Sequence, residues 1–498
     1  MRYLASPENP QELSADRDRI NEISSAPPCK SSSKAPQTKP NPNTLGVSID
    51  SIPPTTIMGV TTKDGFLSPD PEKGPMTKKA LGVESAIPAS GRSSITLNCQ
   101  DRAGFGSETE GDGEVIAATL KVSLRERLRH FTFAWYTLTM STGGISLLLA
   151  LLPHRFPGLT TIGTIIFILS LTLQTLITLL LCLRFILFPS SIYPALTQSP
   201  EAMFVGTFFL SLAATLSNIS IYGIPQCGAW LPVALRVCFW IYLAVTFLVS
   251  ILQYDRLFRN KSHLSASSMT PAWILPIFPV MLAGTLAGFF SPSQPAGHAL
   301  AILAAGAAAQ GLGMLVSVFF YGTYLTRLMA HGLPDLRPGM FIAVGPPSFT
   351  AAALVSMGGD IPRVLSATST EAVPVVAALE LSQPELLGEA FRLVCLGSAV
   401  FLWGLSFWFC ALSLAGLYGM PDAKFHLSWW SFVFPNVGFT IATLRIGEAA
   451  GSDGVEWLGI VMAAILTVVW MGVGGLTVKA VGRREIAWPG RDEDVPHH

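Results

Sequence analysis

Long apolar runs constrain this chain more than any other feature of its sequence. From Phe131 to the C-terminus, predominantly apolar stretches of about 20 or more residues recur between short polar breaks. A helix of that length matches the hydrocarbon core of a bilayer. Only 13% of the 498 residues are charged, whereas soluble chains carry about 25%. The sequence therefore predicts an all-α integral membrane protein.

Ten of these runs are predicted as transmembrane helices. Their connections are short except for residues 359–386, a predicted acidic loop that carries Asp360, Glu371, Glu380 and Glu385. The expected spans are 131–151, 160–187, 201–222, 229–253, 272–290, 299–328, 340–358, 387–416, 425–446 and 456–481.

The polar ends of the chain differ from this membrane domain, which we place at 116–485. Residues 1–115 are rich in Ser, Pro, Thr and Asn and lack periodic apolar positions. Such a segment cannot bury enough surface to offset chain entropy, so we expect a disordered cytoplasmic tail that a regulatory kinase could phosphorylate. Residues 486–498 form a short cytoplasmic tail. "MRYLASPENP" has no apolar region of a cleavable signal, so the first span is expected to direct insertion.

The placement of Lys and Arg orients the spans. Cytoplasmic connections of membrane proteins carry an excess of basic residues, and ten spans place both termini in the cytoplasm. The acidic loop then lies outside. The expected outer basic residues are Arg155, Arg363, Arg392 and Arg445, and the inner ones are Arg125, Arg127, Arg129, Arg184, Arg256, Arg259, Lys261, Arg327, Arg337, Lys424, Lys479, Arg483 and Arg484.

Composition and motifs exclude several classes of function. The formal net charge is zero, which gives no indication of a nucleic-acid partner. No Cys or His cluster has metal-ligand spacing, so neither a metal nor a cofactor is expected. The chain has no His-Glu-x-x-His or Gly-x-Gly-Asp motif, so it is not expected to be an enzyme. Ten spans with both termini inside also disfavour a seven-helix receptor.

A short pattern repeats on alternate spans. "AWILPIFPVMLAGT" and "SWWSFVFPNVGFT" both have a Trp, then four residues, then Phe-Pro, and "MFIAVGPPSFT" has Pro-Pro instead. Proline inside a helix removes a hydrogen bond and kinks it, and broken helices in internal repeats are typical of transporters. The other interpretation is that these prolines only shape a compact bundle. The residues concerned are Phe278, Pro279, Pro346, Pro347, Phe434 and Pro435.

These residues resemble the tellurite-resistance and dicarboxylate-transporter family. It includes bacterial TehA, the slow-type anion channels of plant guard cells, fungal sulfite efflux pumps and fungal malic-acid transporters. "WWSFVFP" is similar to the family's ninth-helix motif, in which the Phe before the Pro plugs the pore. "FTFAWYTLTMSTGGI", "SMTPAWILPIFPVML" and "RPGMFIAVGPPSFTA" most resemble the malic-acid branch. The resemblance covers residues 128–482.

The resemblance implies ten helices arranged as five hairpins with quasi-fivefold symmetry around a central pore. It also implies a homotrimer, which we expect in the plasma membrane. Carried over by motif, Phe434 is the pore gate and Pro435 supplies the kink that presents it. The implied substrate is a C4-dicarboxylate such as malate, and the alternative is sulfite or another inorganic anion.

Helical phase adds candidate residues around Phe434. Gly438, Ile441 and Arg445 share its face, and Arg445 lies ~16 Å further along the helix. There it would attract anions at the outer mouth, unless it only snorkels to headgroups. Arg236, near the outer end of the fourth span, is either a second such cation or an interfacial packing residue.

Small residues on the odd spans could leave the lumen open. Gly143, Gly144, Gly345 and Ser348 are the candidates, although small residues also serve ordinary helix packing. The carboxylates and histidines lie at span ends rather than deep within spans. We therefore expect no internal proton relay, so coupled protons would travel on the substrate.

Overall fold

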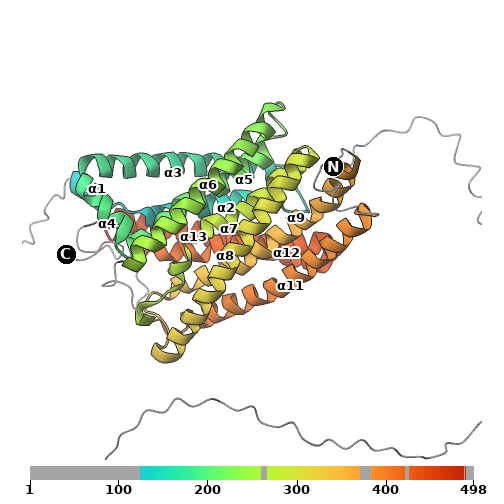
Figure 1. Cartoon of the computed structure of the whole chain (residues 1–498). Coiled ribbons are helices and arrows are strands. Elements are labelled where there is room, and N and C mark those ends of the chain that lie inside the picture. Colours follow the sequence, from blue (N-terminus) through green and yellow to red (C-terminus); the bar gives the residue numbers. More distant parts are fainter. Residues whose placement is uncertain (1–123, 260–265, 371–382, 421–424, 487, 489–498) are drawn as a thin grey trace, which may run out of the picture. The chain divides into compact units, whose positions relative to one another are not determined.

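The structure is a computed structural model that describes residues 124–259, 266–370, 383–420, 425–486 and 488 (Figure 1). All of them belong to the unit Glu110–His498. The predicted disordered tail, residues 1–115, lies outside the described residues, as does nearly all of the predicted tail 486–498. Every regular element of the described residues is helical, which confirms the all-α prediction.

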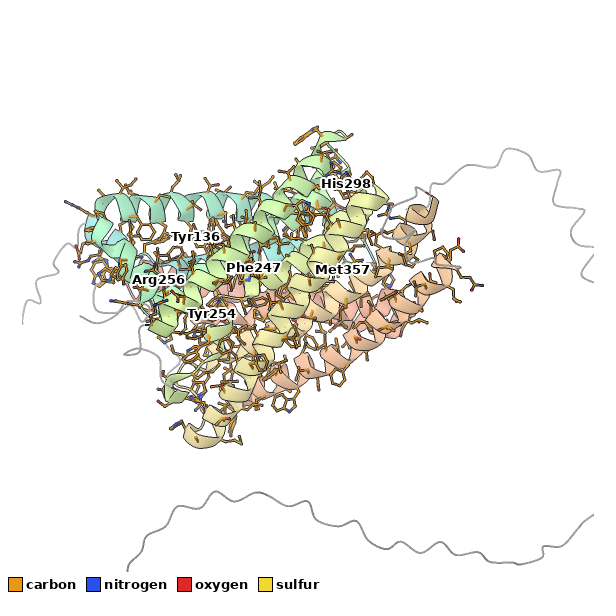
Figure 2. All side chains as sticks on the ribbon, in the orientation of Figure 1. Tyr136, Phe247, Tyr254, Arg256, His298 and Met357 are labelled. Carbon is orange, nitrogen blue, oxygen red and sulfur yellow. The ribbon has the colours of Figure 1, made fainter. Side chains whose placement is uncertain are left out.

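Five long helices present apolar side chains outward. In the most apolar window of each, only 17% to 39% of the residues are buried. Phe319 and Phe401 are 75% and 79% exposed, and Figure 2 labels Phe247, another exposed residue, on α6. Surface of this kind requires lipid as its solvent. These outer helices are α3 (Leu159–Leu187), α6 (Trp230–Arg259), α8 (Ala296–His331), α11 (Pro384–Leu417) and α13 (Asp453–Gly482).

Five further helices are largely buried, and a 3-10 segment precedes each of them. The spans that contain α5 and α9 are 72% and 89% buried in their apolar windows. The inner helices are α2 (Tyr136–Ala150), α5 (Val205–Asn218), α7 (Phe278–Phe290), α9 (Gly345–Thr370) and α12 (Phe434–Ala450). Their 3-10 segments are η1 (Phe133–Trp135), η3 (Glu201–Phe204), η6 (Pro271–Ile274), η8 (Arg337–Val344) and η9 (Leu427–Phe432).

The inner helices pack in a closed ring. α2 contacts α5, α5 contacts α7, α7 contacts α9, α9 contacts α12, and α12 returns to α2. The outer helices cover this ring: α8, for example, packs against both α7 and α9, and α13 against both α12 and α2. Alternate segments of the sequence therefore form an inner and an outer layer (Figure 1).

Each of the ten predicted spans overlaps a helical segment. Seven helices of the described residues are long and apolar enough to cross a membrane, whereas α2, α7 and α12 are shorter. The remaining turns are α1 (Leu124–Arg129), η2 (Pro189–Ser191), α4 (Ile192–Thr197), η4 (Ile219–Gly223, a π-helical turn), η5 (Ala266–Ser268) and η7 (Ser291–Ser293).

Side chains satisfy carbonyl groups of every 3-10 segment that precedes an inner helix. The Tyr254 and Tyr321 hydroxyls of α6 and α8 donate to the carbonyls of Trp273 and Ala343, both at 2.8 Å. Without water, an unsatisfied carbonyl is costly, so these bonds make the breaks in the inner layer tolerable. The remaining donors are Thr207 to the Phe133 carbonyl, Gln253 to Ala202, and Ser141 to Trp430.

The prolines were predicted to lie inside helices and to kink them, but they lie in the first turns of the helices. Pro279 and Pro435 are the second residues of α7 and α12, and Pro346 and Pro347 are the second and third residues of α9. In the first turn the missing N–H has no helical acceptor to lose, so proline is tolerated there. The bend therefore lies just before the proline, where the 3-10 segment gives way to the α-helix.

The predicted acidic loop is wrong over its first part. α9 continues to Thr370 rather than ending near residue 358. Asp360, expected in the loop, is buried in this helix and pairs with Arg363 at 2.7 Å. Glu371 and Glu380 lie outside the described residues, and Glu385 begins α11.

A buried ion pair joins the outer helix α3 to the second inner segment. Arg184, near the end of α3, donates through Nη1 and Nη2 to the two carboxylate oxygens of Glu201 in η3. Its Nη1 also donates to the Phe131 carbonyl at 2.7 Å. Both side chains are buried. Sequence placed both charges at span ends but did not predict that they meet.

We predict that Tyr321→Phe destabilises the protein by about 1–2 kcal/mol, because the buried Ala343 carbonyl loses its donor. Tyr193→Phe, at an exposed tyrosine on α4, is the matched control and should have no effect. Thermal unfolding in detergent measures both variants. Equal stability of the two would show that this hydroxyl does not support η8.

Candidate functional site

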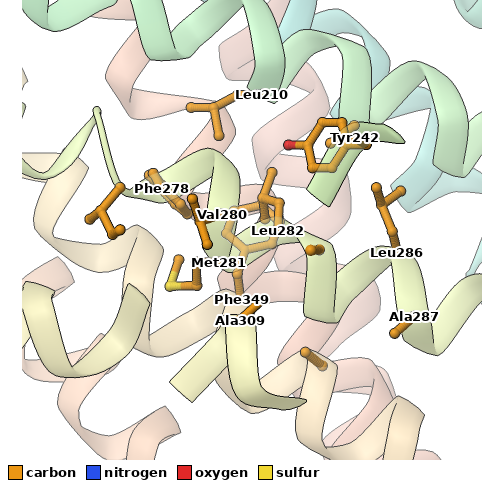
Figure 3. Close-up of a cluster of buried hydrophobic side chains, with 14 of the residues drawn as sticks. Leu210, Tyr242, Phe278, Val280, Met281, Leu282, Leu286, Ala287, Ala309 and Phe349 are labelled. Atoms are coloured by element: carbon orange, nitrogen blue, oxygen red, sulfur yellow. The ribbon is translucent and has the colours of Figure 1, made fainter. Parts of the chain in front are cut away.

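Three phenylalanines from three inner helices meet at the centre of the ring. Phe278 of α7, Phe349 of α9 and Phe434 of α12 are at most 3% exposed. The ring centroids of Phe349 and Phe434 lie 5.0 Å apart in a stacked arrangement. Phe278 meets Phe349 at 5.8 Å and Phe434 at 6.3 Å, both edge to face. Figure 3 shows Phe278 and Phe349 with Leu282 in the buried core. We call these three residues the aromatic cluster.

Glycines make room for these rings. A Cβ atom on Gly345 would lie 2.7 Å from the Phe278 ring, and one on Gly438 would lie 2.6 Å from the Phe349 ring. A Cβ on Gly144 would meet Phe434 Cδ2 at 3.5 Å and Val437 at 3.2 Å. The predicted small residues Gly144 and Gly345 therefore do not open the lumen here. They seat the aromatic cluster.

A small cavity lies on each side of Phe434. One, of about 10 Å³, is lined by Thr137, Met140 and Pro435 among others. The second, of about 20 Å³, borders Thr285 and Val437. Holding one water molecule takes about 10–15 Å³, so neither cavity could admit an organic anion. The aromatic cluster separates these two small cavities.

A larger cavity, the N-terminal chamber, opens at the N-terminal ends of the inner helices. Its volume is about 260 Å³, and it is lined by residues of η1, η3, η5, η6, η8 and η9 and of their flanking turns. Phe204, Ile342 and Ser431 line both this chamber and the smaller cavity below Phe434. The chamber therefore leads directly to the aromatic cluster.

The C-terminal pocket, of about 360 Å³, lies at the opposite ends of these helices. Gly288, Ser356, Asp360, Arg392 and Arg445 are among its lining residues. Helical phase had placed Arg445 on the face of Phe434 toward this end.

The charges of this pocket are largely paired. Arg445 binds Glu448 at 2.8 Å, and Arg392 binds Glu389 at 3.4 Å. Asp360 pairs with Arg363. Arg445 retains a buried Nε without a partner among the described residues, so its capacity to donate is not exhausted by Glu448.

The other predicted residues have varied surroundings. Ser348 is buried, and its hydroxyl lies 2.8 Å from the Gly345 carbonyl and 3.3 Å from the Pro435 carbonyl. Gly143 faces Ser170 of α3 and α5 rather than the aromatic cluster. Arg236 lies half-buried on α6 and lines neither large cavity.

Sequence reasoning missed Phe349 and Arg392. Phe349 follows Gly-Pro-Pro-Ser at the start of α9, and its position one residue after Ser348 was the available signal. Arg392 lies near the start of the outer helix α11. The sequence pattern placed it among the outer basic residues but did not mark it as a site residue. On the opposite face of α12 from the aromatic cluster, Thr443 accepts a hydrogen bond from Trp403 of α11 at 2.8 Å.

A ring of membrane helices with a cavity at each end and a buried aromatic barrier between them defines a channel or transporter. The family described as voltage-dependent anion channels, SLAC1, matches residues 130–478. The chain belongs to this family and is a multi-pass integral membrane protein, so the resemblance seen in its motifs is confirmed.

Curated relatives of this chain are named as transport proteins. The malic acid transport protein of Schizosaccharomyces pombe is 34% identical over 385 residues, which cover 75% of this chain and 84% of that one. A putative malic acid transport protein of the same yeast is 33% identical and covers 75% and 85%. The sulfite efflux pump SSU1 of Trichophyton rubrum is 27% identical and covers 72% and 93%. The names agree with the expectation that the chain is not an enzyme.

Cysteine labelling tests whether the aromatic cluster divides the two large cavities. In a variant without the seven native cysteines, Thr270→Cys in the N-terminal chamber should react with a membrane-impermeant thiol reagent from one side. Ser356→Cys in the C-terminal pocket should react from the other side only. Leu282→Cys, beside Phe434, should stay unlabelled. Rapid labelling of Leu282→Cys would show an open path.

Proposed function

We propose that this protein transports organic anions, foremost malate and related C4-dicarboxylates, through the inner ring, with Phe434 as the gate. The observation that carries the proposal is the position of Phe434 between two small cavities, one of which shares lining residues with the N-terminal chamber. The names of the two yeast relatives support malate as substrate. Sulfite or another inorganic anion is the alternative, favoured by the sulfite efflux pump relatives.

The architecture in this proposal is ten transmembrane helices in five hairpins with quasi-fivefold symmetry. Its support is that each inner helix follows a 3-10 segment and is followed by an outer helix. With their flanking 3-10 turns, α2, α7 and α12 reach about 28 to 38 Å. That length is close to the ~30 Å hydrocarbon core, so all ten segments can cross the bilayer.

The proposed orientation places the N-terminal chamber in the cytoplasm, with both termini. The clusters Arg125–Arg129 and Arg256–Arg259 flank its end of the bundle, and the positive-inside rule assigns such an end to the cytoplasm. Figure 2 shows Arg256 and His298 toward opposite ends. A homotrimer, implied by the family resemblance, in the plasma membrane completes the proposal. The Ser- and Pro-rich composition of the N-terminal tail adds a kinase that acts on it.

Arg445 is proposed to concentrate anions at the external mouth. Its place in the C-terminal pocket supports this role, and its pairing with Glu448 moderates the field that it produces. Arg236 is proposed as a weaker contributor at the same end, because it lines neither cavity.

Phe434→Ala tests the gate. Removing the ring joins the two small cavities, so we expect malate flux into proteoliposomes to rise at least about tenfold, equivalent to about 1.4 kcal/mol of barrier. Phe407→Ala, at an exposed residue of α11, is the control and should leave flux unchanged.

Folding must be checked beside that flux, because truncating a buried Phe costs about 3–5 kcal/mol in soluble proteins. Phe434→Leu keeps more of the packing and should give an intermediate flux. Wild-type flux in well-folded Phe434→Ala protein would remove Phe434 as the gate. Competition of malate uptake by succinate, sulfite, nitrate and chloride then identifies the preferred anion.

Malate uptake into an inside-negative compartment should rise at acid external pH. Each charge costs ~2.3 kcal/mol per 100 mV, so a dianion is opposed by ~4.6 kcal/mol, a factor of about 2000. Protonation of the substrate removes half of this cost or more. Radiolabelled malate uptake at several pH values and fixed potential measures the effect. Uptake that peaks where the dianion dominates would contradict it.

A further inference from the structure

The N-terminal chamber has a chemical character that transport alone does not require. Its described lining residues include no Asp, Glu, Lys or Arg. Two histidines, His130 and His426, line it. His426 immediately precedes η9, and His130 lies three residues before the start of η1. These two segments pack against each other in the ring. The topology thus brings two imidazoles to the same part of one chamber.

Hydroxyl groups continue from the histidines toward the aromatic cluster. Ser428 and Ser431 of η9 and Thr132 beside η1 all line the chamber. The buried Ser428 Oγ has no hydrogen-bond partner among the described residues. Ser431 also borders the small cavity below Phe434. Hydrogen-bond donors therefore line the path from the chamber to the aromatic cluster.

This set of donors suits a carboxylate that must be released again. Hydroxyl and imidazole N–H groups donate to carboxylate oxygens, and a protonated imidazole adds attraction without a permanent charge. Among the described lining residues no carboxylate repels an anion and no fixed cation retains it, which suits weak and reversible binding. The volume, about 260 Å³, lies below that of typical drug-sized pockets and fits a small acid.

We propose that the N-terminal chamber is a carboxylate-binding site for small hydroxy acids in their monoanionic form, in which His130 and His426 set the affinity. The anion would bind at this site before it passes the Phe434 barrier. This part of the proposal rests on the proposed function. Monoanions are favoured because the described lining contains no permanent cation to offset a second buried negative charge.

The proposal makes binding depend on pH through the protein. Imidazole changes its charge between pH 5 and 8, so affinity for an anion should rise as pH falls. Charged groups of the surrounding described segments are paired, hydrogen-bonded or exposed. Arg129, beside His130, pairs with Glu126, and Arg327 donates to the carbonyls of Ser267 and Gly332. Glu201 of η3 pairs with Arg184, and Arg337 of η8 donates to the carbonyls of Gly416 and Tyr418. Asp335 and Glu485 flank lining residues but are exposed.

Lactate is the probe that isolates this effect, because it stays a monoanion from pH 6 to pH 8. Titration calorimetry of the full-length protein in lipid nanodiscs should show about tenfold tighter lactate binding at pH 6 than at pH 8, about 1.4 kcal/mol. The double variant His130→Asn, His426→Asn should lose this difference. His331→Gln, at an exposed histidine that ends α8, should keep it.

The controls separate this proposal from the proposed function. If the double variant is not monodisperse, either single histidine variant replaces it. Each single variant should lose part of the pH dependence of lactate binding, because each imidazole contributes its own charge. Unchanged affinity and pH dependence in folded histidine variants would overturn the carboxylate site. Wild-type proteoliposomes that bind lactate but carry no malate would instead contradict the transport proposal and leave the site intact.

Discussion

The structure depends on satisfying backbone carbonyls at five places where a membrane helix is not an α-helix. Each inner segment begins as a 3-10 turn, which leaves carbonyls that the α-helical pattern would have used. Hydroxyl or amide groups of neighbouring helices donate hydrogen bonds to these carbonyls. Tyr254 donates to the Trp273 carbonyl, and Tyr321 donates to the Ala343 carbonyl. Because hydrocarbon offers no water, these bonds allow the helices to start within the bundle rather than at its surface.

Because α7, α9 and α12 begin inside the bundle, the residues of their first turns form its centre. Phe278 and Phe434 are the first residues of their helices, and Phe349 is the fifth residue of α9. The three rings are therefore delivered to a common level, where Gly345 and Gly438 leave the space that they occupy. A barrier made of side chains on rigid elements can be removed by small movements or by one substitution. This is the property that a gate needs.

The sequence predicted the helical segments well because their apolar length is a local property. The family resemblance singled out Phe434, which lies in the aromatic cluster, and helical phase singled out Arg445, which lines the C-terminal pocket. Their roles as gate and anion attractor stay predictions. The sequence misplaced the kinks, because a proline in the first turn and one in the interior give the same local signal. Phe349 and the Arg184–Glu201 pair were missed because their partners are distant in sequence, and only packing reveals such contacts.

The central claim is that anions pass through the inner ring and that Phe434 blocks their path. Anomalous diffraction from bromide tests this claim most directly. Crystals of the Phe434→Ala variant soaked in bromide should show an anion on the ring axis between Gly144 and residue 434, and crystals of the wild-type protein should show none there. That result would establish that anions pass through the inner ring and that the Phe434 side chain excludes them. Bromide found only between copies of the chain or outside the ring of α2, α5, α7, α9 and α12 would contradict the account.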